Sequence, residues 1–153
     1  MYEGITQVKQ QVPDTTMILN SIASGDNICA SADYRKNRSK ILDTGISLYE
    51  YMGKHSTPGT SLVIDDDIAV VGSYNFDCRS TYVDTETMLV VQGKEITKQL
   101  EEDFDGLKNE SLKVNKDGSY QSGKNVTEST MDGKKQCMIR ILSYIIQAFR
   151  YLA

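Results

Sequence analysis

The sequence predicts an α/β fold, in which a mixed, mostly parallel sheet is flanked by helices and followed by a C-terminal amphipathic helix. Short apolar runs, such as TTMILNSI at 15–22 and SLVIDD at 61–66, are typical of buried strands. They alternate with segments of helical periodicity at 28–44 and 94–112. Strand–helix–strand units of this kind usually build parallel pairs, which is why we expect a mostly parallel sheet.

The N-terminal third of the chain is predicted to hold one such unit. MYEGITQVKQQ at 1–11 has the character of a helix end that Pro13 interrupts, so we expect an upstream half to be missing. Residues 28–44 form an amphipathic helix, which Gly45 ends as a left-handed cap residue. ISLYEYM at 46–52 alternates apolar and polar residues and predicts a strand. The helix has Ile28, Ala32, Ile41 and Leu42 on its apolar side and Arg35, Lys36, Arg38 and Lys40 on its exposed side.

The middle of the chain predicts a loop followed by a hairpin. GKHSTPGT at 53–60 is a loop, because glycines, a proline and hydroxyl residues interrupt it. SLVIDD at 61–66 and IAVVGSYN at 68–75 are two strands that reverse at the acidic turn DDD. TETMLVVQ at 85–92 predicts a further strand of the same sheet.

The remaining segments divide the chain into three parts. Residues 94–112 predict a charged helix packed on the sheet by one apolar stripe. The composition then shifts to small polar residues, which predicts a flexible linker. We therefore expect a globular half-domain at 1–113, a linker at 114–133 and a separate helix at 134–153. The stripe consists of Ile96, Leu100, Phe104 and Leu107.

The C-terminal segment, KKQCMIRILSYIIQAFRYLA, combines basic and apolar residues without any acid. On a helix its polar residues form one narrow strip. Arginines within the span argue against a membrane-crossing helix and favour a helix that lies in the headgroup region of an anionic membrane surface. The alternative is a helix docked into the core or against a partner. The strip contains Gln136, Arg140, Ser143, Gln147 and Arg150.

The overall composition is that of an ordinary globular domain with a net charge of -4. Nucleic-acid-binding domains are usually basic, so we expect no nucleic-acid partner. Cys29, Cys78 and Cys137 lack the spacing of a metal site and, without an apolar leader, indicate reduced thiols inside the cell. His55 is the single histidine, which excludes a multi-histidine metal site. We expect neither a metal nor another cofactor.

An ordered set of polar residues follows the loop. Asp65 comes first, then G-S-x-N at 72–75, N-x-D-x-R-S at 75–80, and Glu86 on the next strand. This set resembles the C-terminal half of a phospholipase D active site, in the cardiolipin-synthase-like bacterial branch of that superfamily. The likeness extends over roughly residues 15–92.

The resemblance implies an enzyme class that uses no metal. One histidine attacks phosphorus and a second protonates the leaving alcohol, so two copies of the motif are needed, normally one from each half. It implies that Ser73 and Asn75 contact the phosphoryl oxygens and that Glu86 orients the partner's histidine. Asp65 is a remnant of the motif with a structural role, and Gly72 allows a close backbone approach beneath the site. Arg79 is expected to pair with Asp77, Asp84 or Glu86.

Two key positions depart from the family pattern, H-x-K-x-x-x-x-D. Counting back from Asp65 puts Pro58 at the histidine and Thr60 at the lysine. Proline has no ionisable group and threonine lacks the positive charge, so the motif is degenerate. His55 lies three residues upstream of Pro58, a displacement of roughly 10 Å in extended chain, and we interpret it as a solvated loop residue.

Three functions remain open. The first is the C-terminal half of a cardiolipin-synthase-like phospholipase D, catalysing phosphatidyl transfer or phospholipid phosphodiester hydrolysis and inactive alone. It would be cytoplasmic, peripheral on the inner face of the cell membrane, and paired with a complementary half or a second copy. The second is a non-catalytic module that binds phospholipid headgroups or a partner. The third is a nuclease-like relative, which the acidic surface disfavours.

Overall fold

The computed structural model describes residues 11–12, 14–57, 59–75, 80, 83–123 and 125–145. The predicted helix end at 1–11 lies almost wholly outside these residues, as do Pro58, Asp77, Cys78, Arg79, Gln147 and Arg150. In chain order the elements are β1 (Thr16–Asn20), α2 (Ile28–Asp43), β2 (Ser47–Tyr51), β3 (Thr60–Ile64), β4 (Ile68–Gly72), β5 (Met88–Gln92), α4 (Lys94–Asn109), β6 (Ser111–Lys113) and α5 (Gly133–Ile145).

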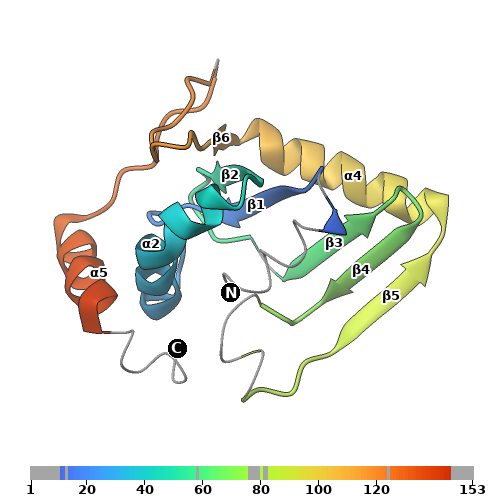
Figure 1. The fold of residues 1–153 in the computed structure, drawn as a ribbon, viewed down its shortest axis with the longest axis horizontal. Coiled ribbons are helices and arrows are strands. Elements are labelled where there is room, and N and C mark those ends of the chain that lie inside the picture. The colour runs from blue at the N-terminus through green and yellow to red at the C-terminus, as the bar shows by residue number, and fades with distance from the viewer. Residues whose placement is uncertain are drawn as a thin grey trace.

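The described strands form two three-stranded sheets, with orders β1-β2-β6 and β3-β4-β5 (Figure 1). The mixed α/β class is confirmed, but the prediction of a mostly parallel sheet is wrong. Only β1 and β2 pair in parallel; β2–β6, β3–β4 and β4–β5 are antiparallel among the described strands. The reason is connection length, because the three-residue turn at 65–67 between β3 and β4 is too short for a parallel crossover.

Helix α2 covers the first sheet and builds the main core with it. Its start is fixed by Asn27, whose side chain accepts hydrogen bonds from the backbone N–H groups of Cys29 and Ala30 at 3.0 and 3.1 Å. Its end is fixed by Gly45 at φ 79°, which confirms the predicted left-handed cap. The core combines Tyr34, Ile41, Leu42, Ile46, Leu48 and Val114.

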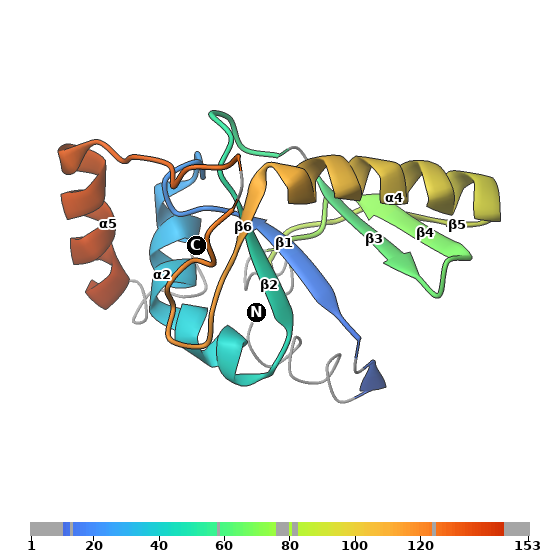
Figure 2. The same ribbon diagram turned by 90° about the horizontal axis from the view of Figure 1, so that it is seen from above.

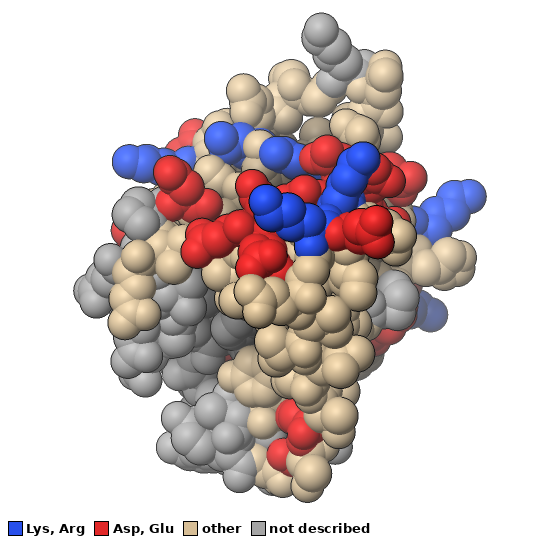
Figure 3. Space-filling model, turned by 90° about the vertical axis from the view of Figure 1, so that its right-hand side faces the viewer, with Lys and Arg blue, Asp and Glu red and all other residues tan. Residues whose placement is uncertain are grey.

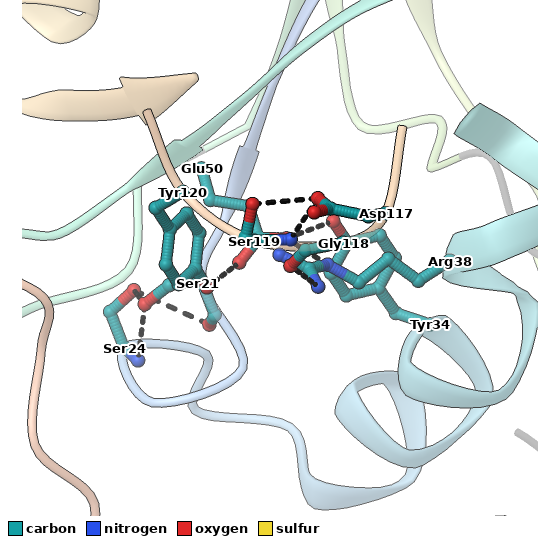
Figure 4. A network of polar contacts seen from close by, with 9 residues as sticks. All are labelled: Ser21, Ser24, Tyr34, Arg38, Glu50, Asp117, Gly118, Ser119 and Tyr120. Carbon is teal, nitrogen blue, oxygen red and sulfur yellow. Dashed lines mark hydrogen bonds and ion pairs between the residues drawn. The ribbon is translucent and has the colours of Figure 1, made fainter. Parts of the chain in front are cut away.

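A fully buried carboxylate lies inside this apolar core. Glu50 follows Leu48 on the inward face of β2, because alternate strand residues share a face. Its Oε1 accepts hydrogen bonds at 2.6 Å from the Tyr34 hydroxyl and the Arg38 Nε, and its Oε2 accepts one at 2.6 Å from the Tyr120 hydroxyl (Figure 4). Arg38, predicted to be exposed, is instead committed to this network.

Part of the predicted linker is packed against the domain. Val114 is buried in the core and forms an isolated bridge with Tyr120. The carbonyl of Gly118 accepts a hydrogen bond from Arg38 Nη1 at 2.7 Å, and Ser129 donates one to the carbonyl of Met52 at 2.6 Å. The prediction of a flexible linker is therefore wrong for residues 114–120. Their small polar residues form a turn that closes over Glu50.

The β3–β4 hairpin was predicted correctly, and its acidic turn seats helix α4. Asp65 and Asp66 adopt left-handed conformations at φ 51° and 55°. The hydroxyl of Thr97, a buried residue of α4, donates a hydrogen bond to the Asp66 carbonyl at 2.9 Å. From there α4 runs across both sheets (Figure 2). The predicted stripe is half-buried at Leu100, Phe104 and Leu107, whereas Ile96 is exposed.

One face of the β3-β4-β5 sheet carries apolar residues that no described helix covers. The register places Leu62, Val70 and Val90 side by side, with Ile64 and Met88 on the same face. Leu62, Ile64, Met88 and Val90 are all exposed, Val90 to 64%. Charged side chains gather in the band formed by α4, and the described surface below that band has few charged side chains (Figure 3).

Helix α5 packs on α2 rather than standing apart. Ile139 is buried together with Ala32, and Lys135 Nζ donates hydrogen bonds to the carbonyls of Ala23 and Gly25 at 2.7 and 2.8 Å. Ser143 is buried too, so the predicted polar strip does not form one solvent-facing side. Among the described residues, no helix has the length and apolar character needed to span a bilayer.

We predict that the Glu50 network makes the protein sensitive to alkali. Burial, together with Glu50, raises the pKa of the Tyr34 and Tyr120 hydroxyls. A raised folded-state pKa means that the stability is complete below the unfolded value near 10 and is lost as pH rises above it. The free energy of unfolding should fall by about 1.4 kcal/mol per pH unit for each tyrosine.

Urea denaturation between pH 9 and 12 measures this slope. Tyr34→Phe and Tyr120→Phe should each make it shallower, whereas Tyr144→Phe, at an exposed position, should leave it unchanged. An unaltered slope in both core variants would show that these hydroxyls do not keep their protons in the fold.

Gly72 should tolerate no side chain. A Cβ added there would lie 2.9 Å from the Met88 Cα and closer still to the Thr87 carbonyl oxygen, so β5 would have to move. We predict that Gly72→Ala lowers the free energy of unfolding by about 1–3 kcal/mol.

The matched control is Gly106→Ala in α4, where a Cβ meets nothing within 4 Å. This change should raise the stability by up to about 1 kcal/mol, because alanine favours helix more than glycine does. Equal stability of Gly72→Ala and the parent in urea denaturation would contradict the close approach of β4 and β5.

Candidate functional site

The β3-β4-β5 sheet brings the motif residues together at one end. Ser73 directly follows β4, and Glu86 lies two residues before β5. Thr60, at the lysine position of the motif, pairs with Gly72 at the start of β3, and Gly72 pairs with Met88. The ladder therefore places Thr60, Ser73 and Glu86 around the same end of the hairpin.

Hydrogen bonds hold Ser73 between Glu86 and β5. The Ser73 hydroxyl donates to the Glu86 carboxylate and accepts from the Thr87 backbone N–H at 3.1 Å. The Ser73 N–H donates to the Thr87 carbonyl at 3.1 Å, which continues the strand pairing by one residue. The Asn75 side-chain amide donates to the Ser73 carbonyl at 3.4 Å. Ser73, Asn75 and Glu86 thus converge.

Gly72 is the reason that this convergence is possible. Any side chain at this position would clash with the backbone of Thr87 and Met88, so only glycine lets β4 and β5 approach at this point. Because Ser73 is the next residue, the same approach puts its hydroxyl within reach of Glu86. The sequence-based expectation of a close backbone approach at Gly72 is confirmed.

Asp65 does not belong to this cluster. It lies in the hairpin turn, at the opposite end of β3 from Thr60, roughly 16 Å away along an extended strand. Its neighbours in the turn contact α4 and β5: Gln92 Nε2 donates to the Asp67 carboxylate at 2.7 Å, and Thr97 binds the Asp66 carbonyl. This position is compatible with the structural role that we predicted, which stays a prediction.

The loop between β2 and β3 is tied to the carboxyl end of β1. Asn20 Oδ1 accepts hydrogen bonds from the Thr57 backbone N–H at 2.9 Å and from the Thr57 hydroxyl at 3.2 Å. The Ser56 hydroxyl donates to the Asp26 carboxylate. The His55 side chain is exposed, and Pro58 lies outside the described residues. The sequence analysis did not identify Asn20 as a residue that holds the loop. A polar residue at the end of a buried strand could have indicated this role.

The described residues of the cluster include no positively charged side chain. The side chains of Thr60, Ser73, Asn75 and Glu86 together carry one negative charge, and the Ser73 hydroxyl already donates a hydrogen bond to the Glu86 carboxylate. A phosphodiester anion would therefore meet few donors and a neighbouring carboxylate. The arrangement positions polar groups, but none of the residues of this cluster that the structure describes carries a positive side chain. Among the described residues no group of three or more His, Cys, Asp or Glu is placed to hold a metal ion.

Comparison with known proteins gives the same assignment as the motif. The family model described as cardiolipin synthase, phospholipase D-like domain, matches residues 2–108. Cardiolipin synthase C of Escherichia coli strain K12 is 30% identical over 121 residues, covering 66% of this chain and 26% of that protein. Cardiolipin synthase of Staphylococcus aureus is 36% identical over 69 residues, 45% of this chain and 14% of that protein.

An uncharacterized protein of Helicobacter pylori is 27% identical over 100 residues, which are 57% of this chain and 20% of that protein. The chain thus spans between a seventh and about a quarter of the length of these relatives. Since the family model covers well over half of the chain, from β1 into α4, the chain belongs to the cardiolipin synthase, phospholipase D-like domain family.

Proposed function

We propose that this chain is the C-terminal half of a cardiolipin-synthase-like phospholipase D, whose reaction is phosphatidyl transfer or phospholipid phosphodiester hydrolysis. It acts peripherally on the inner face of the cell membrane and is inactive alone, because Pro58 and Thr60 replace the catalytic histidine and lysine. The observation that carries the proposal is the convergence of Ser73, Asn75 and Glu86 beside Thr60.

In this proposal each residue acts as its chemistry allows. Ser73 and Asn75 donate hydrogen bonds to the phosphoryl oxygens, where negative charge accumulates as phosphorus becomes pentacovalent. Glu86 accepts a hydrogen bond from the histidine of the complementary half, which frees the Ser73 hydroxyl for the phosphate. The complementary half supplies the positive charge that this cluster lacks.

The uncovered sheet face supports a complementary half as the partner. Leu62, Ile64, Met88 and Val90 form an apolar surface on the same sheet whose end carries Ser73. Apolar surfaces of this kind mark protein interfaces more often than they stay in water. The relatives are several times longer than the matched segment, so they contain the additional chain that could cover such a face.

A non-catalytic headgroup-binding or partner-binding module is the second candidate. The pairing of Ser73 with Glu86 favours it, because the carboxylate is satisfied without any histidine. The two candidates differ in one respect: only the first predicts that the missing side chains restore chemistry.

We predict that the purified chain does not turn over phosphatidylglycerol in detergent micelles. The double variant Pro58→His with Thr60→Lys, mixed with the N-terminal half of a cardiolipin-synthase-like relative, should form product. Adding Asn75→Ala to this restored pair should lower kcat by about a hundredfold, because one donor to the phosphoryl oxygens is lost.

Asn109→Ala, an exposed change at the end of α4, is the control and should leave the restored rate unchanged. Turnover by the parent chain alone would refute the claim of inactivity. A restored pair without product, although both halves are folded and bound to each other, would favour the non-catalytic module.

We further predict that Val90→Lys weakens the association with the complementary half by about tenfold or more, since a charge would be buried in the apolar interface. Sedimentation velocity of the mixed halves measures this. Lys98→Gln on the outer side of α4 is the control. Self-association of the chain through the same face, abolished by Val90→Lys, would identify a second copy as the occupant instead.

A further inference from the structure

Helix α5 presents an apolar stripe on the side that faces away from α2. Met138, Ile141 and Ile145 recur at spacings of three and four, and Tyr144 lies beside them. They are 48%, 56%, 48% and 71% exposed, in the order Met138, Ile141, Ile145 and Tyr144. The buried residues Ile139 and Ser143 occupy the opposite side, against α2. The docking of α5 therefore uses one face and leaves a second apolar face in solvent.

Basic side chains surround this stripe. Lys134 and Arg140 of α5 are exposed, and α5 contains no acidic residue. On α2, Lys36 Nζ lies 5.2 Å from the centre of the Tyr144 ring, which places this lysine at the edge of the stripe. Lys40 is exposed one helical turn further on. Asp43 is the exposed acid of these two helices, whereas the chain as a whole carries a net charge of -4.

The two helices behave as one structural unit. They lie side by side in both ribbon views (Figures 1 and 2). Ile139 packs with Ala32, and Lys135 binds the carbonyls of Ala23 and Gly25 just before α2. The apolar stripe and the basic side chains at its edge are therefore held in a fixed relation. They do not depend on an isolated helix folding at a surface.

We infer that α2 and α5 together form the surface by which this chain lies on an anionic phospholipid bilayer. The apolar stripe of α5 enters the boundary between headgroups and acyl chains, and Lys36, Lys134 and Arg140 contact the lipid phosphates. Charge complementarity selects this occupant, because cations cluster here on an otherwise acidic chain. The inference rests on the proposed function for the choice of phospholipid, but its residues are separate from Ser73, Asn75 and Glu86.

The chain contains no tryptophan, so a single introduced tryptophan reports on one position. Tyr144→Trp should show a blue shift of fluorescence with vesicles of phosphatidylcholine containing phosphatidylglycerol, and little shift with pure phosphatidylcholine. Leu89→Trp, at a similarly exposed apolar site on β5, should show no shift with either. Thermal melts monitored by circular dichroism verify that both variants fold.

Charge variants test the second part of the surface. Removing one cation near an anionic bilayer weakens binding by about fivefold, so Lys134→Gln with Arg140→Gln should weaken vesicle binding by about twenty-fivefold. Lys94→Gln with Lys98→Gln on α4 removes the same charge from exposed positions and should have no effect. The inference is overturned if the fluorescence of Tyr144→Trp does not shift with anionic vesicles or shifts equally with neutral vesicles. It is also overturned if the two α4 substitutions weaken vesicle binding as much as the two α5 substitutions do.

The experiments distinguish a failure of this inference from a failure of the proposed function. Phosphodiester chemistry is assayed in detergent micelles with the restored pair of halves, whereas vesicle binding is assayed with the Tyr144→Trp chain in the absence of the other half. Normal vesicle binding without restored chemistry would contradict the proposed function but would support the membrane-binding surface of α2 and α5. Restored chemistry without vesicle binding would support the proposed function and contradict the membrane-binding surface.

Discussion

The buried carboxylate of Glu50 is the interaction on which the rest of this structure depends. A charge in an apolar core is tolerated only when hydrogen bonds and an opposite charge surround it, and removal of one partner typically costs about 3–5 kcal/mol. Tyr34 and Arg38 come from α2 and Tyr120 from the turn after β6, so one side chain joins β2 to the neighbouring helix and to a turn 70 residues further along the chain. The same network fixes β2, from which the loop to the hairpin departs.

The candidate site depends indirectly on the Glu50 network, through the loop that follows β2. β1 and β2 end together, and Asn20 at that end holds Thr57 of the loop, while the loop leads to Thr60 and the hairpin. Strand pairing then sets Thr60 opposite Gly72, next to Ser73. The polar cluster is thus placed by strand pairing, together with the hydrogen bonds between Asn20 and Thr57 and between Ser73 and Glu86. The backbone pairing that places the cluster does not require a particular side chain at position 60.

Local patterns predicted much of this structure. The limits of α2, its glycine cap, the hairpin and the gathering of Ser73 and Glu86 follow from periodicity and motif order. The partners of Glu50 were not predicted, because a lone acid in an alternating strand suggests an outward position and its partners lie 12, 16 and 70 residues away. Composition also misled at 114–120, where small polar residues form a packed turn. Whether neighbouring strands pair in parallel or antiparallel depends on the length of their connections, which the apolar pattern does not reveal.

The hydrogen-bond pairing of Ser73 with Glu86 was equally beyond the reach of sequence patterns. The motif indicated that both residues face the same ligand, but in this chain they face each other. That contact needs the close approach at Gly72, which depends on three strands at once.

The register of the hairpin has an evolutionary consequence. β3 and β4 pair over five consecutive residues, from Thr60 with Gly72 to Ile64 with Ile68. Inserting one residue into β4 would therefore turn Ser73 to the other face of the sheet. Descendants of this domain can exchange individual side chains here, but they cannot gain or lose a residue between the acidic turn and Ser73. The spacing between the acidic turn and Ser73 is therefore fixed by the strand pairing itself.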